Sequence, residues 1–192
     1  SLVNKVLGRL RNAFADHFKL KDPNTVAWAW IIDFPFYEWD DKNNKIDFGH
    51  NPFSMPKGGI DAFNVNTDEE RLHIIADQYD LVINGYEAAS GAVRNYNPDV
   101  MYKAFEIVGI NRVDVDNKFG AMINAFKFGA PPHAGCAPGL DRIFMVLMDE
   151  PNIREVIAFP KNGSGIDVMM NSPSFIDQSQ LDELNISISD PK

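Results

Sequence analysis

The feature that most constrains the fold is a pair of neighbouring strand-like segments near the middle of the chain. Residues 77–84 and 86–96 are rich in β-forming side chains and are joined near Gly85. Strands joined by so short a connection pair antiparallel, because parallel strands need a crossover of a dozen or more residues. The pair therefore favours an antiparallel sheet and argues against a doubly wound parallel sheet.

The rest of the chain supplies helices and shorter strands around this pair. Apolar periodicity predicts helices at 2–18, 98–108, 115–128 and 140–148. Strands are expected at 26–34, at 134–138 as a short buried strand, and at 156–159, with a polar hairpin-like turn at 40–45. Residues 50–71 are expected to be irregular, and the tail from Ser172 to be loop and short helix. This order predicts an α+β domain with helices packed on an antiparallel sheet.

Composition excludes several classes of protein. The 192 residues suffice for one domain with a hydrophobic core, and no apolar run approaches the ~20 residues that span a bilayer. The single cysteine, Cys136, excludes a disulfide framework and fits a reducing, cytoplasmic location. A net charge of −9 argues against general attraction to nucleic acid, so any such partner must be bound mostly elsewhere.

Two carboxylates in the strand pair could bind a metal. Asp80 and Glu87 lie seven residues apart, and across a turn or bulge both can face one pocket. Mg²⁺ is commonly held by one or two carboxylates together with substrate phosphates. The alternative is that either residue caps a turn or forms a surface ion pair.

Small residues at 88–92 would let a ligand approach the strand backbone closely. They lead to Arg94, whose planar fork suits bidentate binding of a carboxylate. Strict pleating would place Glu87 and Arg94 on opposite faces of the strand, whereas a bulge near Ser90 and Gly91 would place both on one face. The alternative is a thin strand packed under a helix, with Arg94 in a surface ion pair.

A glycine-bounded strand leads into a helix at residues 135–142, where the helix start carries Gly139, Leu140, Asp141 and Arg142. The glycines leave room for a flat ring, and Arg142 could lie over an adenine or meet a phosphate. An ordinary strand-to-helix turn explains the same pattern. The segment lacks the P-loop lysine and the dinucleotide-binding glycine spacing.

Histidine and cysteine give weaker signals. His50 lies in a proline-containing loop, where it either contacts a ligand or is a plain loop residue. No histidine pair has metal-site spacing. Cys136, among small residues, is expected to be buried.

Taken in order, seven stretches resemble the bacterial-type aspartyl-tRNA synthetases, a class II family: 30–39, 49–54, 79–87, 90–94, 127–135, 139–142 and 153–161. The resemblance covers about residues 26–188 and implies the C-terminal half of a catalytic domain at 23–192. Residues 1–22 are similar to the end of the insertion domain, or a linker helix.

The resemblance also implies roles for the candidate residues. His50 would contact the aspartate substrate, and Arg94 would bind its side-chain carboxylate. Asp80 and Glu87 would lie on the Mg²⁺–ATP side, with both as metal ligands. Gly139, Leu140, Asp141 and Arg142 match class II motif 3 at the nucleotide. L-Aspartate would attack the α-phosphate of ATP, and the resulting adenylate would be transferred to tRNA. This chemistry needs no enzyme nucleophile, so no catalytic residue is assigned.

Departures from the family pattern are few, but parts of it are missing. Asn51 stands where a second histidine is common, Ala88 to Ser90 replace a glycine-rich run, and Pro138 replaces an aromatic residue. No motif 1, no motif 2 arginine and no anticodon-binding barrel is found. We therefore expect a fragment that is inactive alone, from a homodimeric parent acting on tRNA(Asp), and on tRNA(Asn) in the nondiscriminating case. The alternatives are a free-standing paralogue that activates an amino acid, and a non-catalytic binding module.

Overall fold

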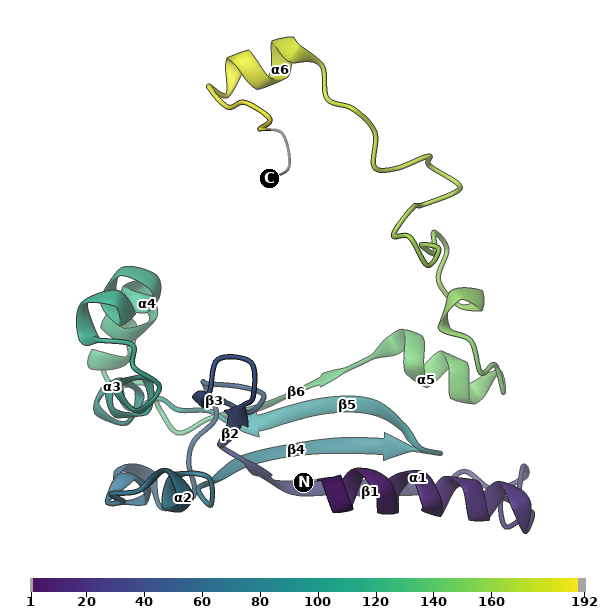
Figure 1. Ribbon diagram of the computed structural model, residues 1–192, viewed down its shortest axis with the longest axis horizontal. Helices are drawn as coiled ribbons and strands as arrows, with labels where there is room; N and C mark the ends of the chain where they lie inside the picture. The colour runs from purple at the N-terminus through teal and green to yellow at the C-terminus, as the bar shows by residue number, and fades with distance from the viewer. Residues whose placement is uncertain (1, 190–192) are drawn as a thin grey trace. The chain divides into compact units, whose positions relative to one another are not determined.

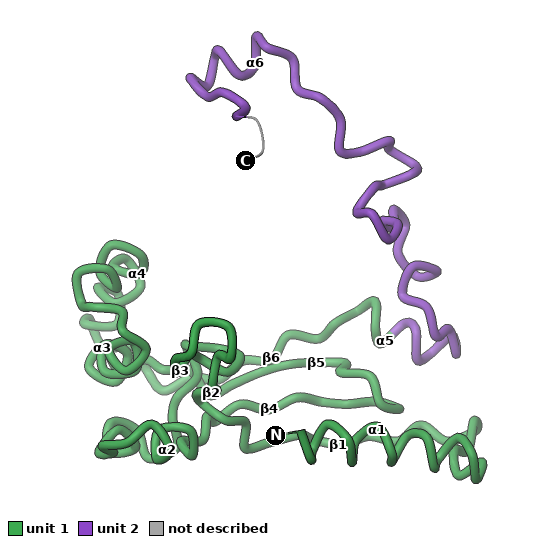
Figure 2. The backbone as a smooth tube through the Cα atoms, in the orientation of Figure 1, with its two compact units in different colours: residues 1–143 green, residues 144–192 purple. Residues whose placement is uncertain are grey.

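The computed structural model describes residues 2–189, and the chain divides into two compact units, Ser1–Ile143 and Phe144–Lys192 (Figures 1 and 2). The strands are β1 (Trp28–Pro35), β2 (Tyr37–Asp40), β3 (Lys45–Phe48), β4 (Ile75–Ile83), β5 (Tyr86–Val93) and β6 (Ala134–Pro138). The α-helices are α1 (Leu2–His17), α2 (Asp68–Arg71), α3 (Pro98–Ile107), α4 (Arg112–Lys127), α5 (Leu140–Leu147) and α6 (Gln178–Glu183). Short 3₁₀ helices are η1 (Gly59–Phe63) and η2 (Ile153–Glu155). None of the helices within 2–189 is long and apolar enough to span a bilayer.

The main sheet has the order β1-β4-β5-β6, with every neighbouring pair antiparallel (Figure 1). The predicted α+β fold with an antiparallel sheet is therefore confirmed. The β4–β5 turn consists of Asn84 and Gly85, whose φ angles of 48° and 88° are the left-handed values of a type I′ hairpin turn. Asn84 also ties this turn to the start of β1, since its Oδ1 accepts a hydrogen bond of 2.7 Å from the Ala27 amide.

Two bulges change which side chains share a face of the sheet. In β1 the register shifts between Ile32 and Phe34, around Asp33, which has a φ of 62° and forms an ion pair with Lys57. In β5 the pairing passes directly from Ala89 to Glu87, so Ala88 is the extra residue. One extra residue reverses the alternation of side chains beyond it.

A loop segment is inserted between β4 and β5 where the two strands separate. Met55 donates its amide to the Val93 carbonyl and accepts a hydrogen bond from the Asp77 amide, both at 2.8 Å. Further bonds of 2.8 Å join Lys57 to Ile75, and Asn95 to Phe53. We call residues 53–57 the wedge segment. It attaches the loop that carries His50 to the ends of both central strands.

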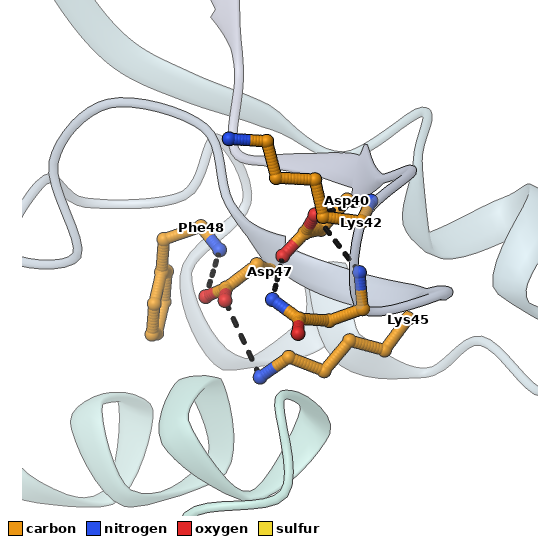
Figure 3. A network of polar contacts seen from close by, with 6 residues as sticks. Asp40, Lys42, Lys45, Asp47 and Phe48 are labelled. Carbon is orange, nitrogen blue, oxygen red and sulfur yellow. Dashed lines mark hydrogen bonds and ion pairs between the residues drawn. The ribbon is translucent and has the colours of Figure 1, made fainter. Parts of the chain in front are cut away.

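The β2–β3 hairpin closes on the polar turn that the sequence predicts (Figure 3). Asp40 accepts hydrogen bonds from the Asn43 side chain at 2.6 Å and the Lys42 amide at 2.9 Å. These donors, the Asn43 side chain first, hold the pKa of the Asp40 carboxyl below its ordinary value. On β3, Asp47 accepts from the Phe48 amide and pairs with Lys45 at 3.3 Å.

The hydrophobic core lies where α3 packs against the hairpin and the start of β4. Its buried members include Phe36, Tyr37, Ala76 and Ala104. The Tyr37 hydroxyl donates to the Ala104 carbonyl at 2.9 Å, and burial raises the pKa of this phenol far above its ordinary value. The helices begin as their caps dictate, since the side chains of Asn97 and Asn111 accept amide hydrogen bonds at the starts of α3 and α4.

Three expectations from the sequence are wrong in whole or in part. Strand β6 forms as predicted but is exposed throughout, because it is an edge strand paired only with β5 in the described chain, and Cys136 is exposed with it. Residues 156–159 form turns instead of a strand, because no described strand lies beside them to accept their hydrogen bonds. The stretch 50–71 is mostly irregular as expected but contains η1 and α2, and α2 begins at a capping box of Thr67 and Glu70.

Candidate active site

Cross-strand pairing sorts the side chains of the sheet onto two faces. Residues directly opposite each other in a sheet project to the same side. Asp80 pairs with Ser90, Gln78 with Ala92, and Val82 with Glu87. Arg94 lies two residues beyond Ala92 on the same extended chain and so shares its face. We call the side that carries Gln78, Asp80, Glu87, Ser90 and Arg94 the polar face.

The bulge at Ala88 brings Glu87 onto this face. Without it, Glu87 and Arg94 would point to opposite sides, because they lie seven residues apart. The sequence left open strict pleating or a bulge near Ser90 and Gly91, and the structure has a bulge with this effect at Ala88. Asp80 and Glu87 thereby become diagonal neighbours, a relation that places Cα atoms about 7–8 Å apart.

One end of the polar face is closed by Arg142 from the start of α5. Its Nη1 lies 3.2 Å from Glu87 Oε1 and donates to the Glu87 carbonyl at 3.0 Å. Both side chains are about half exposed, so the pair is open to a ligand. The Gly139 amide donates to the Ala88 carbonyl at 2.8 Å, which fixes the strand-to-helix turn against β5. Leu140 and Asp141, which follow, are exposed.

Asp80 occupies the middle of the polar face. Only 9% of its surface is exposed, and its Oδ1 has no hydrogen-bond partner in the described chain. A buried carboxylate oxygen left without a donor is costly, so it is suited to a cation or a ligand donor. Within residues 2–189 no group of three or more histidine, cysteine or acidic residues could hold a metal, so protein ligands alone do not make a metal centre.

The other end of the polar face carries Arg94 beside the wedge segment. The Arg94 amide donates to the His133 carbonyl at 2.9 Å, and Arg94 forms an antiparallel bridge with Ser54. No hydrogen bond or ion pair of the Arg94 guanidinium is found among the described residues. Glu87 and Arg94 lie seven residues apart along β5, about 20 Å, so the face has the Glu87–Arg142 ion pair at one end and the Arg94 guanidinium at the other.

His50 lies at the Arg94 end. Its ring is 5.6 Å from that of Phe34, between centroids, and Phe34 pairs with Ala76 beyond the β1 bulge. Ala76 in turn bridges Pro56 of the wedge segment. The sequence-derived candidates thus gather along one face, with His50 and Arg94 at one end and Glu87 and Arg142 at the other. No described hydrogen bond joins His50 to Arg94.

Gly91 faces the opposite side and is required there by packing. A Cβ atom at Gly91 would lie 2.4 Å from both the Gly135 carbonyl oxygen and the Tyr79 ring. The Tyr79 ring crosses Gly91, donates from its hydroxyl to Gly135 at 3.2 Å, and meets Trp30 edge-on at 6.0 Å. The prediction that the small residues of β5 let a ligand approach missed this packing role of Gly91. The sequence feature that could have indicated it is Tyr79, one residue before Asp80.

Comparison with known proteins identifies the class to which this fold and face belong. The family model described as tRNA synthetases class II (D, K and N) matches residues 9–163. The chain belongs to this family of class II tRNA synthetases, which comprises the aspartate, lysine and asparagine enzymes.

Two relatives show which members of this family the chain resembles. The chain is 52% identical over 186 residues to the aspartate–tRNA(Asp/Asn) ligase of Rickettsia bellii, and 54% identical over 188 residues to that of Chlorobium phaeobacteroides. These alignments cover 96% and 98% of this chain, but the chain spans only 31% and 30% of the length of those relatives.

Solved structures share the fold. An aspartyl-tRNA synthetase from Entamoeba histolytica matches with a TM-score of 0.51 and 26% identity, over 73% of this chain and 23% of that one. The asparaginyl-tRNA synthetase of the same organism, in complex with asparaginyl-adenylate, matches with a TM-score of 0.51 and 20% identity, over 73% and 26% of the two chains. The partial class II catalytic fold expected from the sequence is therefore confirmed.

Proposed function

We propose that this chain forms the C-terminal part of the catalytic domain of an aspartate–tRNA ligase, and that the polar face binds aspartate and ATP. The observation that carries this proposal is the common face of Asp80, Glu87 and Arg94, with Arg142 paired to Glu87. The similarity to aspartate–tRNA(Asp/Asn) ligases supports the choice of amino acid. No specific observation favours the paralogue or the non-catalytic module.

The two ends of the face have different tasks in this proposal. Arg94 binds the side-chain carboxylate of aspartate with its planar fork, and His50 contacts the same substrate from its loop. Arg142 meets the nucleotide, held in place by Glu87, and the Gly139–Asp141 turn leaves room for the adenine. Aspartate and ATP therefore meet between the two ends, so that the α-carboxylate faces the α-phosphate.

The reaction joins one α-carboxylate oxygen to the α-phosphorus and releases pyrophosphate. The residues named here orient the reactants and balance their charge, and no side chain forms a covalent bond. A Mg²⁺ ion would neutralise phosphate charge. The buried, unpartnered Oδ1 of Asp80 fits such an ion, with Glu87 as its diagonal neighbour.

Further features of the whole protein belong to the same proposal. We assign residues 1–22 to the end of an insertion domain or a linker, and 23–192 to the catalytic domain. The parent is a cytoplasmic homodimer that charges tRNA(Asp), and tRNA(Asn) if it is nondiscriminating. The net charge of −9 supports a tRNA-binding surface that lies mostly outside this chain.

Aspartate-dependent ATP–pyrophosphate exchange tests the proposal. A complete ligase carrying this chain should catalyse exchange with aspartate, whereas the purified 192-residue chain should show none, because its sequence has no recognisable motif 2 arginine to bind the α-phosphate. Both proteins are assayed at equal molar concentration, with lysine and asparagine as competing amino acids. Exchange by the isolated chain, or exchange by the complete protein with lysine in place of aspartate, would contradict the proposal.

A further inference from the structure

Ser54 in the wedge segment has a hydroxyl that the proposed chemistry has not used. Its side chain is fully buried, at 0% exposure, and its Oγ has no hydrogen-bond partner among the described residues. A buried hydroxyl without a partner is destabilising, and most buried polar side-chain atoms in proteins are paired. A polar group that comes within reach of Ser54 when the site is occupied would remove this cost.

The backbone bonds of the wedge segment place this hydroxyl beside Arg94. The Met55 amide donates to the Val93 carbonyl, and the Asn95 amide donates to the Phe53 carbonyl, both at 2.8 Å. These bonds flank Ser54 and Arg94, which makes them a non-hydrogen-bonded antiparallel pair. In such a pair the Cα atoms are about 4.5 Å apart, and the two side chains project together from one face.

We propose that Ser54 is a positioning residue for Arg94. When the fork of Arg94 binds the side-chain carboxylate of aspartate, Ser54 Oγ accepts a hydrogen bond from an N–H group that the carboxylate does not use. Arginine has five N–H donors, and a bidentate carboxylate takes two of them. This inference rests on the proposed function, because it needs Arg94 to bind the substrate carboxylate.

A neutral acceptor suits this position better than an acidic one. A second carboxylate beside Arg94 would compete with the substrate for its charge, whereas a hydroxyl fixes the guanidinium and leaves the charge available. The guanidinium has no described hydrogen-bond partner, so ordering it on substrate binding costs side-chain entropy, and a bond to Ser54 would hold it in place against the carboxylate.

Ser54→Ala in the complete ligase tests the proposal. We expect the KM for aspartate to rise about tenfold, as for one hydrogen bond to a charged group, with kcat and the KM for ATP within about twofold of the parent. Ser54→Thr keeps the hydroxyl and should restore the KM for aspartate to within about threefold. Thermal unfolding of each variant reports separately on stability.

Asn95→Ala is the matched control. Asn95 is also buried, at 1% exposure, and its Nδ2 also lacks a partner, but it follows Arg94 in an extended chain and so points to the other side. The Asn95→Ala variant should be less stable than the parent protein and should keep the parent's KM for aspartate. An equal rise in KM for Asn95→Ala would attribute the effect to packing and overturn the inference.

Arg94→Leu, assayed beside these variants, separates the inference from the proposed function. If Arg94→Leu loses aspartate activation and Ser54→Ala leaves the KM for aspartate unchanged, the positioning role is wrong and the proposed function stands. If Arg94→Leu itself leaves that KM unchanged, the proposed function fails, and the inference fails with it.

Discussion

Replacing Arg94 with leucine in the complete ligase is expected to abolish measurable aspartate activation. The substrate carboxylate would lose its bidentate partner, and the cation of the wedge segment, Lys57, is already paired with Asp33. Removing one member of such a hydrogen-bonded charge pair costs about 2–5 kcal/mol or more. We expect kcat/KM for aspartate in pyrophosphate exchange to fall by about a thousandfold or more.

The substitution should weaken the binding of aspartate and leave the binding of ATP unchanged. Arg94 lies about 20 Å along β5 from the Glu87–Arg142 pair, so ATP binding, measured by equilibrium dialysis, should be nearly unchanged. Arg112→Leu is a control for the loss of one arginine, since its guanidinium lies 4.0 Å over the Tyr102 ring and outside the polar face. An unchanged KM for aspartate in Arg94→Leu would show that this residue does not bind the carboxylate.

Gly91→Ala is expected to be the most destabilising single-methyl change in the central strands. The new Cβ would lie 2.4 Å from a backbone oxygen and from the Tyr79 ring, and the oxygen belongs to a paired strand that cannot yield without breaking its bonds. Overpacking of this kind costs typically 1–3 kcal/mol, and sometimes more. We expect about 3 kcal/mol, measured by urea unfolding of the complete protein.

Gly135→Ala is the control for this change. Gly135 lies in the neighbouring strand β6, and a Cβ there meets nothing within 4 Å, so its stability should change by less than about 1 kcal/mol. The alternative reading of the small residues in β5 is close approach by a ligand. A Gly91→Ala protein with unchanged stability but lost exchange activity would favour ligand approach and contradict the packing role.

Local pattern explains why much of the fold was predictable. The segment 77–96 alternates β-forming residues around Gly85, and the hairpin of β4 and β5 forms there. Helices α3 and α4 follow asparagine caps and agree with the apolar periodicity of 98–108 and 115–128. These elements depend on neighbours in sequence, and a single sequence contains that information.

Features that depend on distant partners were not predictable. A β5 bulge near Ser90 and Gly91 was one of two arrangements that the sequence left open. The Tyr79 ring packs over Gly91, and the extra residue is Ala88. Segment 156–159 has strand-like residues but lacks a neighbouring strand in the described chain. The chemistry of the site residues and the resemblance of their motifs predict their roles. The position of Ser54 opposite Arg94 depends on hydrogen bonds between the wedge segment and β5, which join residues far apart in the sequence.

The most direct test of the central claim is a crystal structure of the complete ligase with a non-hydrolysable aspartyl-adenylate analogue. We predict that the analogue lies along the polar face, with its side-chain carboxylate on Arg94 and its adenosine at Arg142. An analogue bound on the opposite face, over Tyr79 and Trp30, or bound with its carboxylate away from Arg94, would contradict the account.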